Sequence, residues 1–244
     1  MRRTGWLIFL VVALACFAAA QSSPHYAPFF ATKAVYVYQG GSANSPDGKN
    51  TVSVRLLDEN ADDFPSEVLV RTPSGTLRAT IHFGLNAQVL WSGNSKAFAI
   101  TGSSEGGNGR YQTDIFYIEA NRLRRAPLTP VLERAFGHPV RCGWSELPNV
   151  VAVKWLEGSS ALLVATQIIA HSNCDSFGTF AGFVVGDDGL RVVKRFNQLE
   201  VKRLYGSDLG PELRDANDDC IRNPSSCFVS TNHPELTSKA QSSR

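Results

Sequence analysis

The sequence predicts an all-β fold built from repeated antiparallel meanders, and three observations indicate it. Strand-like apolar runs alternate with turns rich in Gly, Asn, Asp and Pro. Several runs, such as Leu162-Leu163-Val164-Ala165, have no polar face, so the sheets that they form must be covered on both sides. The same order of turn, strand, loop and hairpin occurs three times. A β-sandwich made of three meanders is the alternative arrangement of the same units.

The three copies share one register. The spacing from the end of the opening turn to the next hairpin turn is 26, 25 and 29 positions, for the pairs Lys49 and Gly75, Lys96 and Asn121, and Ser160 and Gly189. Three similar spacings indicate an internal repeat of about 46 residues. The predicted units cover residues 45–83, 91–125 and 155–196.

The units lie in one predicted domain over residues 34–230, whose first strand is expected at 34–38. An extended linker at 21–33 precedes the domain, and a disordered tail at 231–244 follows it. At 244 residues the chain is long enough for one sizeable core, whereas two full domains would be cramped.

Two short helices are expected in the insertions between and after the units. Residues 129–137 have an N-cap, a proline at the first helical position and a terminal glycine. A second helix is predicted within residues 211–221, with Ser207 or Asp208 as its N-cap.

The N-terminus has the three parts of a secretory signal peptide. Arg2 and Arg3 are followed by an apolar run at 6–17 and by the small-residue cleavage site Ala18-Ala19-Ala20. This run is shorter than the roughly 20 residues that span a bilayer, and no later run is long enough. The sequence therefore predicts a secreted or periplasmic protein without membrane insertion after cleavage.

An alternative lies inside the same segment. Ala13-Leu14-Ala15-Cys16 resembles a bacterial lipobox, in which the cysteine becomes the lipidated first residue. Cys16 is therefore a candidate lipidation site, and the alternative product is a surface-anchored lipoprotein.

Removal of residues 1–20 leaves an even set of cysteines, Cys142, Cys174, Cys220 and Cys227. Export favours disulfides, and of the three possible pairings we expect Cys142 with Cys174 and Cys220 with Cys227. No pair has the C-x-x-C spacing of a zinc site, and we expect no metal or cofactor. Cleavage also lowers the number of basic residues from 24 to 22, equal to the number of acidic residues. A neutral protein has no electrostatic footprint for nucleic acid.

Catalytic patterns are weak in this sequence. The five histidines, His25, His82, His138, His171 and His233, are scattered, and no H-E-x-x-H motif occurs. The stretch 102–106 has the G-x-S-x-G spacing, but a strand follows it, so it is not a G-x-S-x-G nucleophile elbow. We therefore expect no catalytic residues. The Asp215-Ala216-Asn217-Asp218-Asp219 run resembles the start of a calcium loop but lacks the later glycine and glutamate. Trp91, Trp144 and Trp155 fit either a sugar-stacking platform or, because two of them occupy equivalent repeat positions, a recurring structural role.

The Gly-rich stretch at 102–110 is predicted to be a loop inside the second unit. A strand follows it where a phosphate cradle requires a helix, so we interpret it as a candidate contact loop for a partner. Its candidate binding residues are Gly102, Glu105, Asn108 and Arg110.

Residues 45–196 resemble the TolB-like, WD-repeat-like β-propeller modules of bacterial exported proteins. Their blades start with Pro-Asp-Gly-Lys before a strand, and Ser45-Pro46-Asp47-Gly48-Lys49 matches this pattern. Trp91-Ser92-Gly93-Asn94-Ser95-Lys96 matches in part, and the stretch 155–160 matches more weakly. The resemblance implies a small or incomplete propeller-like fold, because three units are visible and propellers have about four or more blades.

These observations favour a non-catalytic exported scaffold that binds a protein or an envelope component through its loops. The alternative functions are a secreted hydrolase of glycans or peptides, with histidines converging in space, and a lipoprotein anchored through Cys16.

Overall fold

The computed structural model describes most of the predicted domain. The described residues are 29–37, 40–58, 61, 64–105, 109–136, 147–156, 160–168, 178–186, 191–218 and 222. The predicted signal peptide with Cys16, the four cysteines of the mature chain and the tail at 231–244 lie outside these residues, so their predictions remain predictions.

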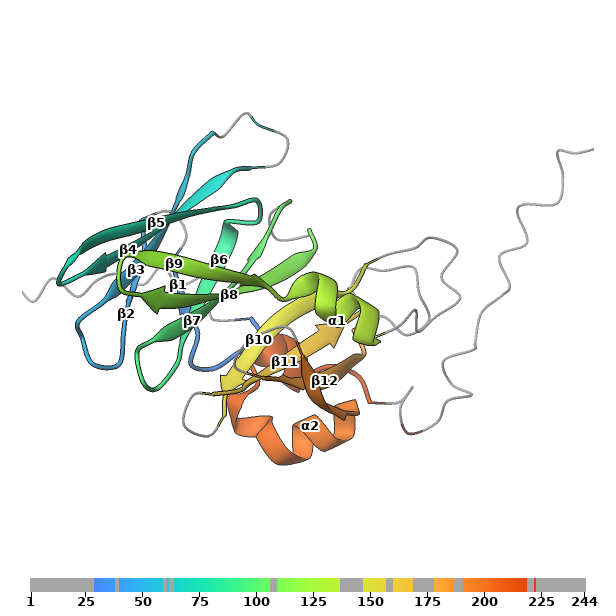
Figure 1. Ribbon diagram of the computed structural model, residues 1–244. Helices are drawn as coiled ribbons and strands as arrows, with labels where there is room; N and C mark the ends of the chain where they lie inside the picture. Colours follow the sequence, from blue (N-terminus) through green and yellow to red (C-terminus); the bar gives the residue numbers. More distant parts are fainter. Residues whose placement is uncertain are drawn as a thin grey trace, which may run out of the picture.

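Three antiparallel sheets, each built on four consecutive strands, make up this part of the chain (Figure 1). The first sheet contains β2 (Ser42–Asn44), β3 (Thr51–Leu56), β4 (Ser66–Thr72) and β5 (Gly75–Ile81). The second contains β6 (Leu85–Trp91), β7 (Ala97–Ser103), β8 (Tyr111–Glu119) and β9 (Arg122–Pro127), with β1 (Val35–Tyr36) beside β6. The third contains β10 (Asn149–Trp155), β11 (Leu162–Gln167), β12 (Phe180–Val185) and β13 (Val192–Phe196). The prediction of an all-β fold with three repeated meanders is confirmed.

Each unit begins one strand earlier than the sequence predicts. The opening turn joins the first two strands of its sheet, so the predicted units omit β2 and most of β6 and β10. In β2 a single residue, Ala43, is buried between two exposed ones, which gives too short an alternation to read as a strand. Pairing with β3 across the turn is what makes this segment a strand.

The sheets stack face to face in chain order. Along β7, Phe98 and Ile100 belong to the core between the first and second sheets, whereas Ala99 belongs to the core between the second and third. Both faces of the second sheet are therefore buried, which explains why its strands lack polar alternation. The arrangement is sandwich-like and open, because none of the described sheets closes into a barrel.

The outer face of the first sheet ends the stack at one side. Along β3 the buried Val52 and Val54 alternate with more exposed polar residues. On this face the Glu67 carboxylate accepts hydrogen bonds from Arg55 and Arg78, at 2.7 and 2.8 Å. A solvated ionic network of this kind stabilises the fold little, but it makes the face unsuited to a further sheet.

The inner edge of the third sheet is closed by side chains of the second. The Ala152 amide of β10 donates to Thr101 Oγ1 at 3.1 Å, and Thr113 Oγ1 donates to the Val150 carbonyl at 2.7 Å. Both threonines are buried. These bonds satisfy backbone groups that would otherwise be orphaned between two apolar sheets.

Two of the observed helices correspond to predictions. Helix α1 (Thr129–Phe136) forms where the sequence predicts it and buries Leu132 and Phe136 in the core between the second and third sheets. Helix α3 (Pro211–Arg214) is shorter than the predicted helix at 211–221. Its N-cap is Gly210, whereas the predicted caps Ser207 and Asp208 lie in the 3-10 turn η3 (Gly206–Asp208).

Helix α2 (Gln198–Tyr205) is not predicted. It begins with a capping box, in which the Asn197 side chain accepts from the Glu200 amide and Glu200 accepts from the Asn197 amide. Its Val201 packs with Leu209 and Leu213 in the core on the far face of the third sheet. Figure 1 shows α1 and α2 on opposite sides of the sheet that carries β10 to β12.

The last part of the predicted linker is packed into the fold. The Thr32 amide donates to the Asp208 carbonyl at 3.0 Å, and the Gly210 amide donates to the Phe30 carbonyl at 2.8 Å. Phe30 and Ala31 are buried. We call this pairing of residues 29–32 with 207–212 the terminal clasp, because it joins the two ends of the described chain.

We expect Gly210→Ala to loosen the terminal clasp. A Cβ at this position would lie 2.6 Å from the Phe29 carbonyl oxygen, so the backbone must shift, at a cost of about 1–3 kcal/mol. The control is Gly206→Ala, because that site is open and its φ of −55° suits any residue, which predicts a gain of about 0.4–1 kcal/mol. Urea unfolding measures both variants, and equal stability of the two would contradict the clasp.

Candidate binding cleft

The opening turn of the first unit is fixed by a closed set of hydrogen bonds. Ser45 Oγ donates to Asp47 Oδ1 at 2.6 Å and accepts from the Asn50 amide at 2.9 Å. The Ser45 hydroxyl, followed by the Lys49 amide, lowers the pKa of Asp47. Gly48, with a φ of +71°, takes the left-handed position that glycine adopts without strain.

The second unit repeats this turn with Gly93, Asn94 and Ser95 in place of the proline, aspartate and glycine. Ser92 Oγ donates to Asn94 Oδ1 at 2.8 Å and accepts from the Ala97 amide at 3.0 Å. Ser95, with a φ of +60°, occupies the left-handed position. The Ser95 hydroxyl also accepts from the Asp47 amide at 3.1 Å, so the two turns lie in contact. The partial sequence match therefore corresponds to the same local structure.

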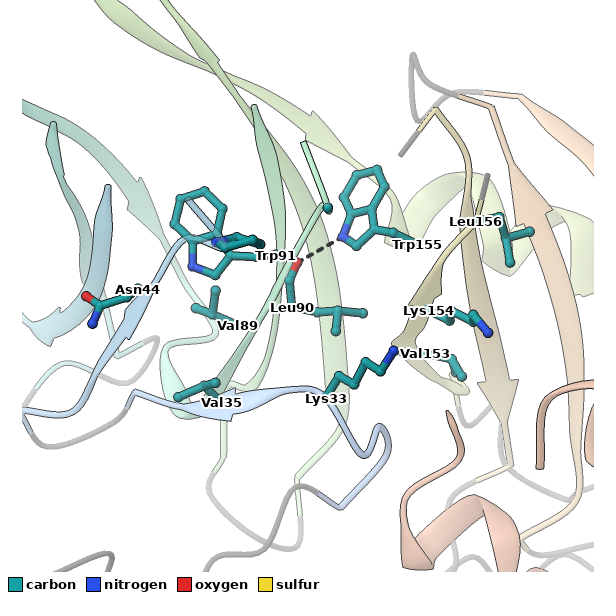
Figure 2. Close-up of a pocket in the computed structure, with 12 residues that line it drawn as sticks. Lys33, Val35, Asn44, Val89, Leu90, Trp91, Val153, Lys154, Trp155 and Leu156 are labelled. Atoms are coloured by element: carbon teal, nitrogen blue, oxygen red, sulfur yellow. Dashed lines mark hydrogen bonds between the residues drawn. The ribbon is translucent and has the colours of Figure 1, made fainter. Parts of the chain in front are cut away.

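Two tryptophans connect neighbouring sheets at equivalent positions. Trp91, at the end of β6, donates its indole N–H to the Ala43 carbonyl of the first sheet at 3.2 Å. Trp155, at the end of β10, donates to the Leu90 carbonyl of the second sheet at 2.9 Å (Figure 2). Ala43 and Leu90 occupy equivalent positions in the first and second units. Each lies two residues before the serine that begins the opening turn. Trp91 and Trp155 therefore have the same structural role in successive units, as the interpretation of a recurring role predicts.

A cleft of about 560 Å³ lies where the first strands of the three units meet. Its aliphatic lining comes from β1, from β6 and from the end of β10 with the residue after it, and comprises Val35, Val89, Leu90, Val153 and Leu156. Both tryptophan rings, Asn44 and the turn residues Pro46 and Gly93 complete the lining. The repeat itself therefore forms the cleft, because each unit contributes the end of its first strand.

Two lysines are the charged residues of this lining. Lys154 Nζ lies 2.7 Å from Asp208 Oδ2 and 5.8 Å from the centre of the Tyr205 ring. Figure 2 shows Lys33 reaching across the cleft toward the strand of Val153, whereas Lys154 points to the other side of that strand. Within the described ranges no carboxylate lies at ion-pair distance from Lys33. Counting only these ranges, the cleft therefore presents one uncompensated positive charge on an apolar lining.

Catalytic groups do not converge in the described part of this cleft. His82 is exposed just beyond β5, while the other four histidines lie outside the described residues. The residues that the structure describes contain no group of three His, Cys, Asp or Glu side chains able to hold a metal ion. Of the acidic run after α3, Asp215 pairs with Arg214 and Asp218 accepts from Lys202.

The predicted contact loop is only partly described, and its residues are separated. Gly102 is a buried residue of β7, where a Cβ would lie 2.1 Å from the Phe83 carbonyl oxygen, so it is not a loop residue. Arg110 donates to the Pro148 carbonyl at 3.1 Å and pairs with Glu133, and burial lowers its pKa. Glu105 is exposed, and Asn108 lies outside the described residues.

Lys33 and Lys154 were not predicted as site residues. Lys33 lies in a segment read as linker, and its place in the cleft depends on the terminal clasp. Lys154 does have a local signal, because it is the single charged residue in the apolar run of β10.

Comparison of the chain with protein-family models, with curated proteins and with solved structures finds no match in any of the three. No helix among the described residues has the length and apolarity needed to cross a membrane.

We expect Trp155→Phe to destabilise the contact between the second and third sheets by about 1–2 kcal/mol, because it removes the indole hydrogen bond to the Leu90 carbonyl and part of the ring that packs on this core. Trp91→Phe should behave alike, since it removes the equivalent bond to the Ala43 carbonyl between the first and second sheets. Guanidinium unfolding of both variants measures this equivalence. A neutral effect of both substitutions would show that the indole bonds are incidental.

Proposed function

We propose that this chain is an exported, non-catalytic β-repeat scaffold that binds a protein or an envelope component through the inner cleft. The observation that carries the proposal is the cleft itself. Its volume of about 560 Å³ lies within the range of about 300–1,000 Å³ that is typical of ligand sites. Apolar walls with few polar groups are also typical of such sites.

Its position in the fold supports the same proposal. The turns at Ser45 and Ser92 and the indole bonds of Trp91 and Trp155 fix the strand ends around the cleft. A rigid frame lowers the entropy that binding must offset. The cleft is also accessible, since Val35 in its lining is 42% exposed.

We further propose that the scaffold is a shortened relative of the TolB-like, WD-repeat-like propeller modules. The Pro-Asp-Gly-Lys turn and its structural copy in the second unit support this relationship. Export is proposed from the N-terminal sequence. In this reading three units form an open array, and the ligand occupies the place where the first strands of the units converge.

Site-specific photo-cross-linking tests the binding function. A photoreactive phenylalanine analogue replaces Val35 in the cleft or, as the control, Leu57 beyond β3, because both are exposed apolar residues, at 42% and 49%. Cells that export the protein are irradiated, and adducts are identified by mass spectrometry. We expect a discrete adduct from position 35 and none from position 57. Equal labelling from both positions, or none from position 35, would contradict the proposal.

A further inference from the structure

The charge of the cleft points to the chemistry of its ligand. Both charged residues in its lining are lysines, and Asp208 neutralises Lys154. Lys33 has no carboxylate at ion-pair distance among the residues that the structure describes. Its ammonium therefore leaves a positive charge at an apolar surface, where a carboxylate can form a charge-assisted hydrogen bond.

The position of Lys33 is fixed by the terminal clasp on one side and by a turn on the other. The amide of Thr32 donates to the Asp208 carbonyl at 3.0 Å, and the amide of Ala34 donates to the Ala31 carbonyl at 3.3 Å. On the protein side, the Lys33 side chain is then the part of this segment that has to be ordered when an anion binds, which limits the entropy cost of binding. The clasp thus presents this lysine at the cleft in advance of binding.

The apolar part of the lining favours a polypeptide as the ligand. Val35, Leu90 and Leu156 come from separate segments, and Val35 is 42% exposed. Small molecules usually bind in sites that bury most of their surface, whereas an open apolar surface with a charged rim is typical of peptide recognition. A membrane surface is a poor alternative, because the mature chain is close to neutral and lacks long-range attraction to anionic lipids.

We infer that the cleft binds a polypeptide segment of a partner protein in which an aspartate or glutamate stands beside apolar side chains. The ligand carboxylate pairs with Lys33, and the neighbouring apolar groups lie on Val35, Leu90 and Leu156. This inference rests on the proposed function and adds the chemical class of the partner.

Peptide binding to the mature protein tests the inference. The probes are an acetylated and amidated Leu-Val-Asp-Leu-Val peptide and its twin with Asn in place of Asp. Fluorescence of the tryptophans in the cleft and calorimetry both report binding. We expect the Asp peptide to bind about tenfold more tightly than its twin. Lys33→Gln should remove this difference, whereas Lys49→Gln, which removes an exposed lysine outside the lining, should preserve it.

Equal affinity of the unmodified protein for both peptides, or no saturable binding of either, would overturn the inference. Lys33-dependent binding to phosphatidylglycerol vesicles without peptide binding would also overturn it. Cross-linking from position 35 in the Lys33→Gln variant separates this failure from that of the proposed function. If the adduct from position 35 persists while the preference for the Asp peptide is absent, the cleft binds its partner without an acidic group. If the protein that retains Lys33 gives no adduct from position 35, the proposed binding function itself is wrong.

Discussion

A buried pair of threonine hydroxyls holds the third sheet against the second, and the stack of sheets depends on this contact. An edge strand carries backbone N–H and C=O groups that need partners, and burying such an edge between apolar sheets leaves no water to supply them. Thr101 and Thr113 supply these partners to Ala152 and Val150. At the contact between the first and second sheets, the edge strand β6 pairs with β1, which supplies hydrogen-bond partners to its backbone. The inner edges of the second and third sheets are therefore both closed, but by different means.

The ends of the stack explain how three units suffice without closing a ring. The polar outer face of the first sheet tolerates water, whereas α2, α3 and the terminal clasp cover the far face of the third. The outer edge strand β13 carries Lys194 and Arg195 and a bulge next to Val184, features that discourage pairing with another chain. The same clasp that covers the third sheet brings Lys33 to the cleft, so the closure of the fold and the composition of the candidate site are coupled.

Local signals predicted the hairpins, the turns and α1, because these features depend on residues close together in the sequence. The strand β2 was missed because Ser42-Ala43-Asn44 has no pattern apart from its pairing with β3. Helix α2 was missed although Asn197 and Glu200 form a capping box, a signal that was present. The cleft could not be predicted, because Lys33 and Lys154 are positioned by long-range contacts with Asp208 and its neighbours.

Hydrogen exchange of the Ala152 amide tests most directly whether the threonine hydroxyls close the stack. An amide on an unprotected strand edge exchanges quickly, whereas one bonded to a buried acceptor exchanges only when the core opens. We predict that Ala152 exchanges as slowly as the core of β11, that the exposed edge residue Val193 exchanges fast, and that Thr101→Val selectively accelerates Ala152. Fast exchange of Ala152 in the unmodified protein, or exchange unaffected by Thr101→Val, would contradict this account.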